Sequence, residues 1–291
     1  MARSEWQSTT KLIASAAQVL AAEHPMTIRQ LFYRLVSATI IENCLRDYQR
    51  VSMAMTKARE DDRVPFEWIV DRSRVTYSSR GWANLQTLGE VLEETLVNYR
   101  RDYWQDQPHY VEIWCEKDAV TGSIEEVREQ YSLRVEAIRG FNSTRNIYAT
   151  AQRLLRQEED GKTITIFYLG DWDPSGQDIE RDLAHRLAEY GLVDVNLERI
   201  AIFKEDIQWF NLPPLRVKDK DPRASKFKSR HGNEAVELDA LPPTELRSRL
   251  RRAIDEVIDR QAWDRATMVE QAQQETCVRY AGVFKEMTTH Q

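Results

Sequence analysis

The sequence predicts an α/β protein in which a helical N-terminal domain is followed by a parallel sheet covered by helices. Three observations support this fold class. Apolar residues recur at helical spacing through the first 60 residues, and from residue 110 onward strand-like and helix-like segments alternate. Two of the strand-like segments end directly in acidic residues. Alternation of this kind is typical of parallel sheets with helical crossovers.

The N-terminal part of the chain reads as three helices, over residues 8–23, 28–37 and 46–59, followed by a strand over residues 64–70. Thr27 is a suitable N-cap for the second helix. Three short helices followed by a strand pair are typical of a winged helix-turn-helix domain, whose third helix lies in the major groove of DNA. The alternative is a generic helical bundle. The expected DNA contacts of the third helix are Arg46, Arg50 and Lys57.

The rest of the chain predicts a linker helix and a sheet domain. Apolar residues lie on one face of a long helix over residues 82–103. The expected strands are 110–115, 133–138, 163–169 and 195–202, the helices between them are 119–130, 144–157 and 177–190, and two further helices are 244–260 and 263–284. We therefore divide the chain into residues 1–80, 81–105 and 106–291.

Charge is unevenly distributed along the 291 residues, although the net charge is only −6. Residues 101–210 hold 13 Lys and Arg against 22 Asp and Glu. Residues 216–230 reverse that balance. Their cations are Arg216, Lys218, Lys220, Arg223, Lys226, Lys228 and Arg230. A basic segment of this density can bind the phosphate backbone of DNA, here through Lys226, Lys228 and Arg230. The alternative is a solvated surface loop.

The sequence further predicts a cytoplasmic, nucleoid-associated protein. The start of the chain lacks the apolar core of a signal peptide, and no apolar run approaches the ~20 residues of a membrane span. The three cysteines, Cys44, Cys115 and Cys277, are far apart, which argues against a disulfide framework or a zinc site.

Acidic residues follow two of the predicted strands. Glu116 follows the strand over residues 110–115, and Asp171 and Asp173 follow the strand over residues 163–169. Carboxyl ends of parallel strands meet at one edge of a sheet. Three carboxylates there repel one another unless a cation lies between them, and oxygen ligands suit Mg²⁺ or Mn²⁺. Two alternatives are that the aspartates only cap the next helix, or that a Lys or Arg side chain fills the place of the cation.

The order of these acidic residues resembles the Toprim domain of topoisomerases, primases and some nucleases. The resemblance implies a Rossmann-like parallel sheet and a metal site formed by Glu116, Asp171 and Asp173, with Lys117 and Asp118 beside it.

A second motif lies upstream, in residues 27–35, Thr-Ile-Arg-Gln-Leu-Phe-Tyr-Arg-Leu. It resembles the Arg-acidic-aliphatic-Tyr-Tyr motif of the topoisomerase VI A-like family, which also includes a meiotic relative. The resemblance implies that Tyr33 is a nucleophile in a winged-helix domain and that a homodimer cuts DNA, each tyrosine working with the metal of the other copy. Arg29 lies one helical turn before Tyr33, on the same face. Gln30 and Phe32 depart from the motif, and the compact Mini-A group is the closest match in size.

The predicted function is metal-dependent DNA cleavage by transesterification through Tyr33, with Arg29 and Glu116 as the other catalytic residues. A nuclease of the Wadjet plasmid-defence system shares the architecture but hydrolyses DNA without needing the tyrosine, so a hydrolytic endonuclease is the first alternative. A DNA-binding factor that does not cut is the second. Tyr33 can also be a core aromatic. Because no Gly-x-x-x-x-Gly-Lys-Ser/Thr motif is present, strand passage would need a separate ATPase partner.

Two weaker motifs complete the prediction. Residues 140–145 can contact phosphate through backbone N–H groups and Arg145 at a helix start. Glu237 and Asp239 precede Pro242, and we interpret them as helix caps rather than as an acidic site.

Overall fold

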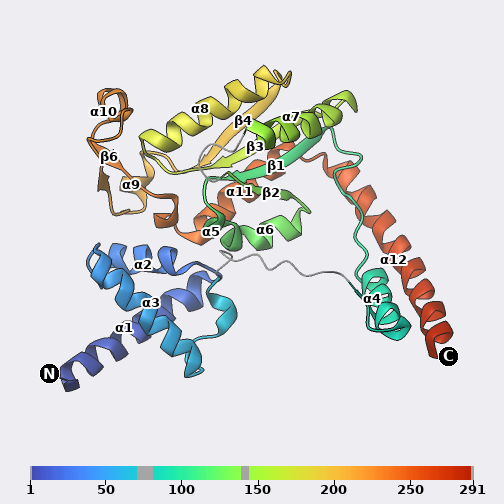
Figure 1. Ribbon diagram of the computed structural model, residues 1–291, viewed down its shortest axis with the longest axis horizontal. Helices are drawn as coiled ribbons and strands as arrows, with labels where there is room; N and C mark the ends of the chain where they lie inside the picture. The colour runs from blue at the N-terminus through green and yellow to red at the C-terminus, as the bar shows by residue number, and fades with distance from the viewer. Residues whose placement is uncertain (1, 71–80, 139–143, 290–291) are drawn as a thin grey trace. The chain divides into compact units, whose positions relative to one another are not determined.

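The computed structural model describes residues 2–70, 81–138 and 144–289 (Figure 1). The chain is 60% helical with a four-stranded parallel sheet, which confirms the predicted α/β class. It divides into two compact units. The first comprises residues 1–74 with 111–256, and the second comprises residues 75–110 with 257–291. The N-terminal helices and the sheet therefore share one unit, and the segment before the first strand belongs with the C-terminal helix.

The three predicted N-terminal helices are confirmed. They are α1 (Ala2–Glu23), α2 (Ile28–Ser37) and α3 (Leu45–Glu60). A reciprocal capping box starts α2, because the Gln30 backbone N donates to Thr27 Oγ1 over 3.1 Å and the Thr27 backbone N donates to Gln30 Oε1 over 2.8 Å. Leu31 and Leu35 of α2 are fully buried against the neighbouring helices.

The prediction of a strand over residues 64–70 is wrong. This segment forms a 3₁₀ helix, η1 (Phe66–Trp68), and only Ile69 makes a single β-bridge, with Met26. Pro65 explains the difference, because its ring fixes φ and it has no N–H to donate to a ladder. Residues 71–80, where a second strand of the wing would continue, lie outside the described residues.

The sheet consists of β1 (His109–Cys115), β2 (Arg134–Ala137), β3 (Thr163–Leu169) and β4 (Val195–Ala201). Their order is β2-β1-β3-β4. The chain leaves β1 toward one edge of the sheet and later crosses to the other edge through β3, so the direction of the connections reverses between β1 and β3. Open α/β sheets bind ligands at such a switch point.

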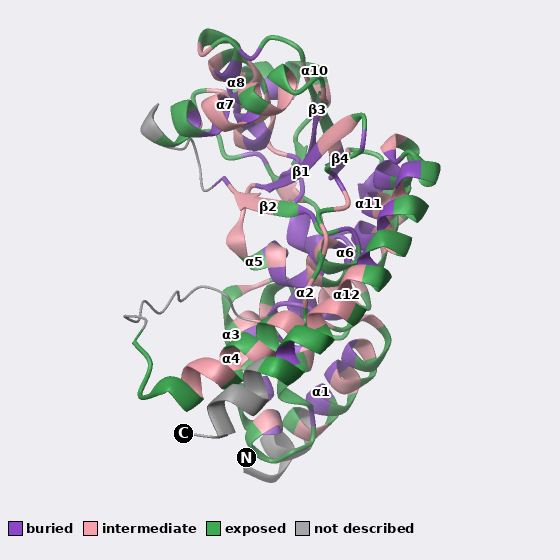
Figure 2. Cartoon of the chain, turned by 90° about the vertical axis from the view of Figure 1, so that its right-hand side faces the viewer, coloured by how far each residue is buried: buried purple, intermediate pink, exposed green. Residues whose placement is uncertain are grey.

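The crossover helices cover both faces of the sheet (Figure 1). They are α5 (Asp118–Thr121), η2 (Gly122–Ile124) and α6 (Glu125–Gln130) after β1, α7 (Thr144–Glu159) after β2, and α8 (Pro174–Glu189) after β3. Opposite directions of travel place α5 and α6 on one face and α7 and α8 on the other, as right-handed crossovers require. Figure 2 shows the buried residues concentrated in the sheet and in the helices facing it.

The single helix predicted over residues 119–130 is broken at Gly122. A Cβ atom at this position would lie 2.7 Å from Val70 Cγ2, so the chain needs glycine there for close approach to the segment after η1. The helix tightens to 3₁₀ geometry at the same place.

The segment after β4 carries more structure than the sequence predicted. It forms α9 (Asp206–Trp209), β5 (Leu215–Arg216), α10 (Ala224–His231), β6 (Glu234–Ala235), η3 (Leu238–Ala240) and α11 (Pro243–Val257). The expected basic loop is therefore partly wrong, because residues 224–231 are helical. Phe227 is buried and holds α10 in place.

A buried arginine fixes the N-terminal helices within the first unit. Arg247 of α11 donates from Nη1 to the Ser123 carbonyl over 3.0 Å and from Nη2 to the Glu23 carbonyl over 3.3 Å. Ser123 Oγ also donates to Gln30 Oε1 of α2 over 2.5 Å. These contacts place α2 beside the helices that follow β1.

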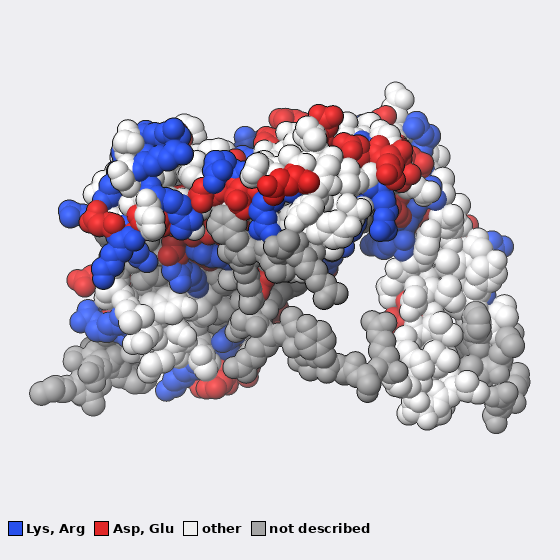
Figure 3. All heavy atoms as spheres, turned by 45° about the horizontal axis from the view of Figure 1, so that its top comes forward, with Lys and Arg blue, Asp and Glu red and all other residues white. Residues whose placement is uncertain are grey.

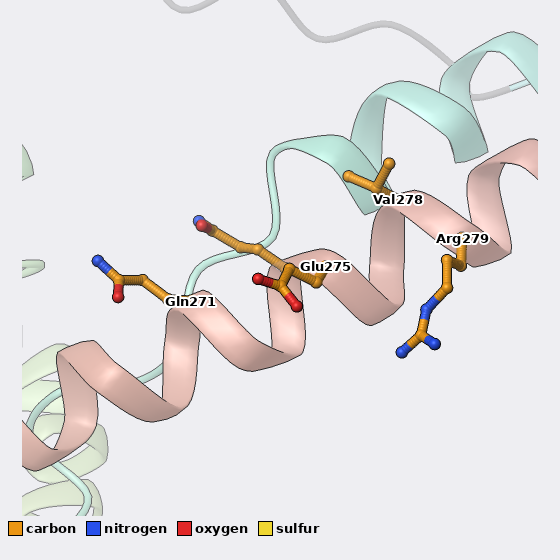
Figure 4. Close-up of a pocket in the computed structure, with 5 residues that line it drawn as sticks. Gln271, Glu275, Val278 and Arg279 are labelled. Atoms are coloured by element: carbon orange, nitrogen blue, oxygen red, sulfur yellow. The ribbon is translucent and has the colours of Figure 1, made fainter.

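The second unit is a pair of helices, α4 (Leu85–Val97) and α12 (Arg260–Thr289), which pack against each other. The helix expected over residues 82–103 is shorter, because Asn84 caps its start and it ends at Val97. Residues on α12 line a hollow of about 740 Å³, which includes none of the predicted site residues (Figure 4). None of the helices in the described ranges has the length and apolar character to cross a membrane.

Candidate metal and DNA-cleavage site

Glu116, Asp171 and Asp173 are neighbours at the ends of β1 and β3, but their ligand atoms do not form a set within 4.8 Å of one another among the described residues. The Glu116 backbone N donates to the Leu169 carbonyl over 2.8 Å, which extends the pairing of the two strands beyond β1. Glu116 Oε2 in turn accepts a hydrogen bond of 2.9 Å from the Asp171 backbone N. The two strand ends are thus joined by one backbone and one side-chain hydrogen bond.

The two aspartates have different local roles. Asp173 is the N-cap of α8, and its Oδ1 accepts from the Gly176 backbone N over 2.7 Å. The capping alternative is therefore correct for Asp173. It is not correct for Asp171, which is buried and whose Oδ1 accepts from the Leu238 backbone N over 2.8 Å.

Lys117 provides the cation nearest to Asp171. Its Nζ lies 2.7 Å from Asp171 Oδ2, 3.4 Å from Glu237 Oε2 and 3.5 Å from Asp239 Oδ2. These carboxylates raise the pKa of Lys117 despite its burial. The predicted alternative of a structural ion pair therefore holds for Asp171. Within the described part of the chain, no ion pair reaches Glu116 or Asp173.

Burial and mutual repulsion leave the remaining carboxylates under electrostatic strain. Burial, with the neighbouring Asp171, raises the pKa of Glu116 to about 7. Burial also raises the pKa of Asp173 and of the fully buried Asp239. Among the described atoms, neither oxygen of Asp239 has a hydrogen-bond donor.

Carboxylates outnumber cations in this cluster. Glu116, Asp171, Asp173, Glu237 and Asp239 carry five carboxylates, and the cations facing them are Lys117 and Arg29. Mg²⁺ or Mn²⁺ would offset such an excess of carboxylates, and Glu116, Asp171 and Asp173 would be the residues to hold it.

A different set of acidic and thiol groups is already close together. Ligand atoms of Glu42, Cys44 and Asp47 all lie within 4.8 Å of one another, before and in the first turn of α3. Asp47 is occupied there, because its carboxylate accepts from Arg50 over 2.8 Å and from the Glu42 backbone N over 3.1 Å. These hydrogen bonds indicate that the start of α3 brings the three side chains together.

Arg29 and Tyr33 of α2 face the same carboxylates. Arg29 forms two hydrogen bonds with Glu237, from Nε over 2.7 Å and from Nη2 over 2.6 Å. The Arg29 guanidinium carbon lies 5.9 Å from the centre of the Tyr33 ring. Tyr33 is only 4% exposed. Burial first, and then Glu237, raise the pKa of its phenol to about 12, although Arg29 acts in the opposite direction.

The prediction that Glu237 and Asp239 are helix caps is wrong. Glu237 precedes η3 without any side-chain capping bond, because its carboxylate is turned to Arg29 and Lys117. The two acidic residues lie about 65 positions after Asp171, and only the folding of the β5–β6 segment brings them to it.

Arg199 is a further residue that the sequence did not reveal. From β4 its buried guanidinium donates to the carbonyls of Gly170 over 3.0 Å and Gly176 over 3.2 Å, and it pairs with Glu180 over 2.7 Å. These bonds fix both sides of the loop that carries Asp171 and Asp173. The sign of this role in the sequence was a single arginine, Arg199, within the predicted strand over residues 195–202.

The predicted DNA contacts lie on two helices. On α3, Arg46 and Arg50 pair with Asp47 over 3.7 Å and 2.8 Å, while Lys57 is exposed. On α10, Lys226 and Arg230 are exposed and Lys228 pairs with Asp219 over 2.5 Å. Figure 3 shows Lys and Arg side chains gathered at the upper left, over the region of α10. The Arg145 side chain and residues 140–143 lie outside the described part of the chain.

Trp172, between the two aspartates, connects their loop to α10. Its ring packs edge-on against Phe227 and His231, with centroids 5.8 Å and 5.0 Å away. Its backbone also pairs with Val236 through two hydrogen bonds of 2.9 Å. The basic helix is therefore held next to the predicted metal loop.

No protein-family model matches the chain, and a search of curated proteins finds no match.

We expect Glu116→Gln to stabilise the metal-free protein at alkaline pH. The pKa of Glu116 is raised from 4.5 to about 7 on folding, so its ionisation opposes folding increasingly as the pH rises between these values. The gain in unfolding free energy should be about 3 kcal/mol at pH 8 and about 1 kcal/mol at pH 5. Urea unfolding in EDTA measures it, with the exposed Glu159→Gln as control. An equal effect at both pH values would contradict the strained carboxylate.

Gly176→Ala should disturb the site directly. A Cβ atom at residue 176 would clash with the Asp171 carbonyl oxygen and lie 3.2 Å from Glu116 Oε2. We expect a loss of roughly 1–3 kcal/mol of stability and weaker Mn²⁺ binding, measured by thermal unfolding and calorimetry. Gly282→Ala is the matched control, because nothing lies within 4 Å of that position. Wild-type behaviour of both variants would show that the loop is loosely packed.

Proposed function

We propose that this protein is a metal-dependent DNA-cleaving enzyme with a winged-helix-like N-terminal part and a Toprim-like sheet. One observation carries the proposal. Glu116 and the pair Asp171 and Asp173 lie at adjoining ends of β1 and β3, at the switch point of a parallel sheet, in a cluster with excess negative charge. Open α/β sheets bind their ligands at this place.

We assign different roles to the residues of the cluster. Glu116, Asp171 and Asp173 would hold Mg²⁺ or Mn²⁺, which stabilises negative charge on a phosphate when bound. The Asp171 backbone N–H orients Glu116, and Lys117 forms an ion pair with the Asp171 carboxylate. Burial and Asp171 raise the pKa of Glu116 to about 7 in the metal-free protein, and a bound divalent cation would favour its ionised form.

DNA is the proposed substrate because basic side chains adjoin the acidic cluster. The exposed Lys226 and Arg230 lie on α10, which Trp172 holds against the loop between Asp171 and Asp173. A basic helix beside a carboxylate site can fix the phosphate backbone while the cation acts on one phosphate. The exposed Lys57 on α3 extends this surface in the winged-helix interpretation.

Two mechanisms compete for the cleavage step. Transesterification through Tyr33 is supported by Arg29, which lies beside the ring and faces the cluster. Hydrolysis is supported by the burial of Tyr33 and by its phenol pKa of about 12, since a buried neutral phenol is a poor nucleophile. Because hydrolysis does not require the buried phenol to reach a phosphate, we propose hydrolysis as the cleavage step.

Incubation with supercoiled plasmid and Mg²⁺ or Mn²⁺ tests the function and the mechanism together. We expect cleavage that falls at least 100-fold in Asp173→Asn, because a metal ligand is lost. Under hydrolysis, Tyr33→Phe retains cleavage and leaves free 5′-phosphate ends. Under transesterification, denaturation leaves a covalent protein–DNA adduct that Tyr33→Phe abolishes. Tyr190→Phe is the control for loss of a hydroxyl.

Absence of cleavage by a folded protein that still binds duplex DNA would contradict the proposed enzyme and leave a DNA-binding factor. Absence of both cleavage and salt-sensitive binding would reject DNA as the substrate.

The resemblance to the topoisomerase VI A-like family also suggests a homodimer that cuts in trans. Arg29 and Lys117 share Glu237 within one chain, so the tyrosine motif already meets the carboxylates without a second copy. Mixing Tyr33→Phe with Asp171→Ala distinguishes the two arrangements. Restored covalent cleavage together with a dimeric mass supports action in trans. A monomeric mass without restoration supports a site within one chain.

A further inference from the structure

A cavity of about 280 Å³ adjoins the acidic cluster. It lies between the start of α8, with Asp173 and Ser175, and the β5–β6 segment, with Arg216, Lys218 and Arg223. Asp173 and Glu237 line the cavity and also belong to the carboxylate cluster. A group bound in the cavity would therefore lie next to the proposed metal site.

The acidic residues of the cavity wall already have partners. Arg223 Nε contacts Asp221 Oδ1 over 3.0 Å, and its Nη1 lies 3.5 Å from Asp178. Glu237 is paired with Arg29 and Lys117, and Asp173 accepts from the Gly176 backbone N. These carboxylates thus already have hydrogen-bond or ion-pair partners within the protein.

Two basic side chains of the cavity wall are not paired in this way. Arg216 and Lys218 are exposed, and neither makes an ion pair with any residue that the structure describes. Arg216 ends β5, Lys218 follows the buried Val217, and both basic residues line the cavity. Two unpaired cations of the same wall favour an anion, and their donor groups suit a phosphate.

We propose that this cavity binds one phosphate group of a nucleic-acid strand beside the carboxylate cluster. The class of substrate rests on the proposed function, whereas the anion preference rests on Arg216 and Lys218. Its volume lies just below the range of roughly 300–1,000 Å³ for small-molecule sites, so it holds one nucleotide-sized group and not a longer stretch of strand. The phosphate is either internal to the strand or at a 5′ end.

Fluorescence anisotropy with the full-length protein in EDTA tests the site without cleavage. The probes are two oligonucleotides of the same sequence, one with a 5′-phosphate and one with a 5′-hydroxyl. We expect Arg216→Gln and Lys218→Gln each to weaken binding about tenfold. Lys220→Gln is the matched control, because it removes the same charge two residues away and does not line the cavity. It should change affinity less than threefold.

The two probes identify the source of the phosphate. A loss confined to the 5′-phosphorylated probe assigns the cavity to strand ends, and an equal loss for both probes assigns it to an internal phosphate. Equal weakening by Lys218→Gln and Lys220→Gln would overturn the proposal, because the effect would then be diffuse surface charge. Unchanged binding in Arg216→Gln and Lys218→Gln, with unchanged circular dichroism, would overturn it as well.

The plasmid assay separates this inference from the proposed function. Weaker oligonucleotide binding by Arg216→Gln and Lys218→Gln, together with no DNA cleavage by the wild-type protein, would support the phosphate site and contradict the proposed enzyme activity. If the wild-type protein cuts DNA and both variants cut with unchanged KM, the enzyme stands and the phosphate site is rejected.

Discussion

Asp171 makes the contacts on which the rest of the site depends. Its backbone N–H holds the Glu116 carboxylate, one side-chain oxygen accepts from the Leu238 N–H, and the other contacts Lys117. A single residue thus joins the ends of β1 and β3 to the segment before α11. Because Asp171 is buried, these bonds are not exchanged for water at low cost, and the carboxylates around it stay crowded. Lys117 contributes one positive charge to this crowded cluster.

Glu237 extends the same charge network to the N-terminal helices. Its carboxylate binds Arg29 of α2 and Lys117, which follows β1. Ser123 Oγ donates to Gln30 of α2, and Arg247 donates to the Ser123 carbonyl. Tyr33 is therefore held near the cluster, yet its phenol is buried and its pKa is raised to about 12. The same contacts that bring the tyrosine motif to the cluster make its phenol costly to ionise.

Opposite charges are arranged in adjoining layers around the sheet edge. The carboxylates lie at the strand ends, whereas α10 and the β5–β6 segment place cations beside them. Trp172 couples the two layers, since it stands between Asp171 and Asp173 and packs against α10. Under the proposed function, the cations would contact the DNA backbone while one phosphate reaches the acidic cluster, in spite of the net charge of −6.

The local elements were readable from the sequence, and the contacts among distant residues were not. Helical spacing predicted α1 to α3, the Thr27 cap is a three-residue interaction, and alternation predicted the sheet with Glu116 and Asp171 at its edge. These follow from short-range periodicity and from the rule that parallel strands end together. Tertiary structure alone decided that Lys117 neutralises Asp171, that Glu237 and Asp239 face the site instead of capping a helix, and that Arg199 fixes its loop. The physical reason is that these contacts depend on distance in space, and no local pattern records which residue meets another that lies 29 to 208 positions away.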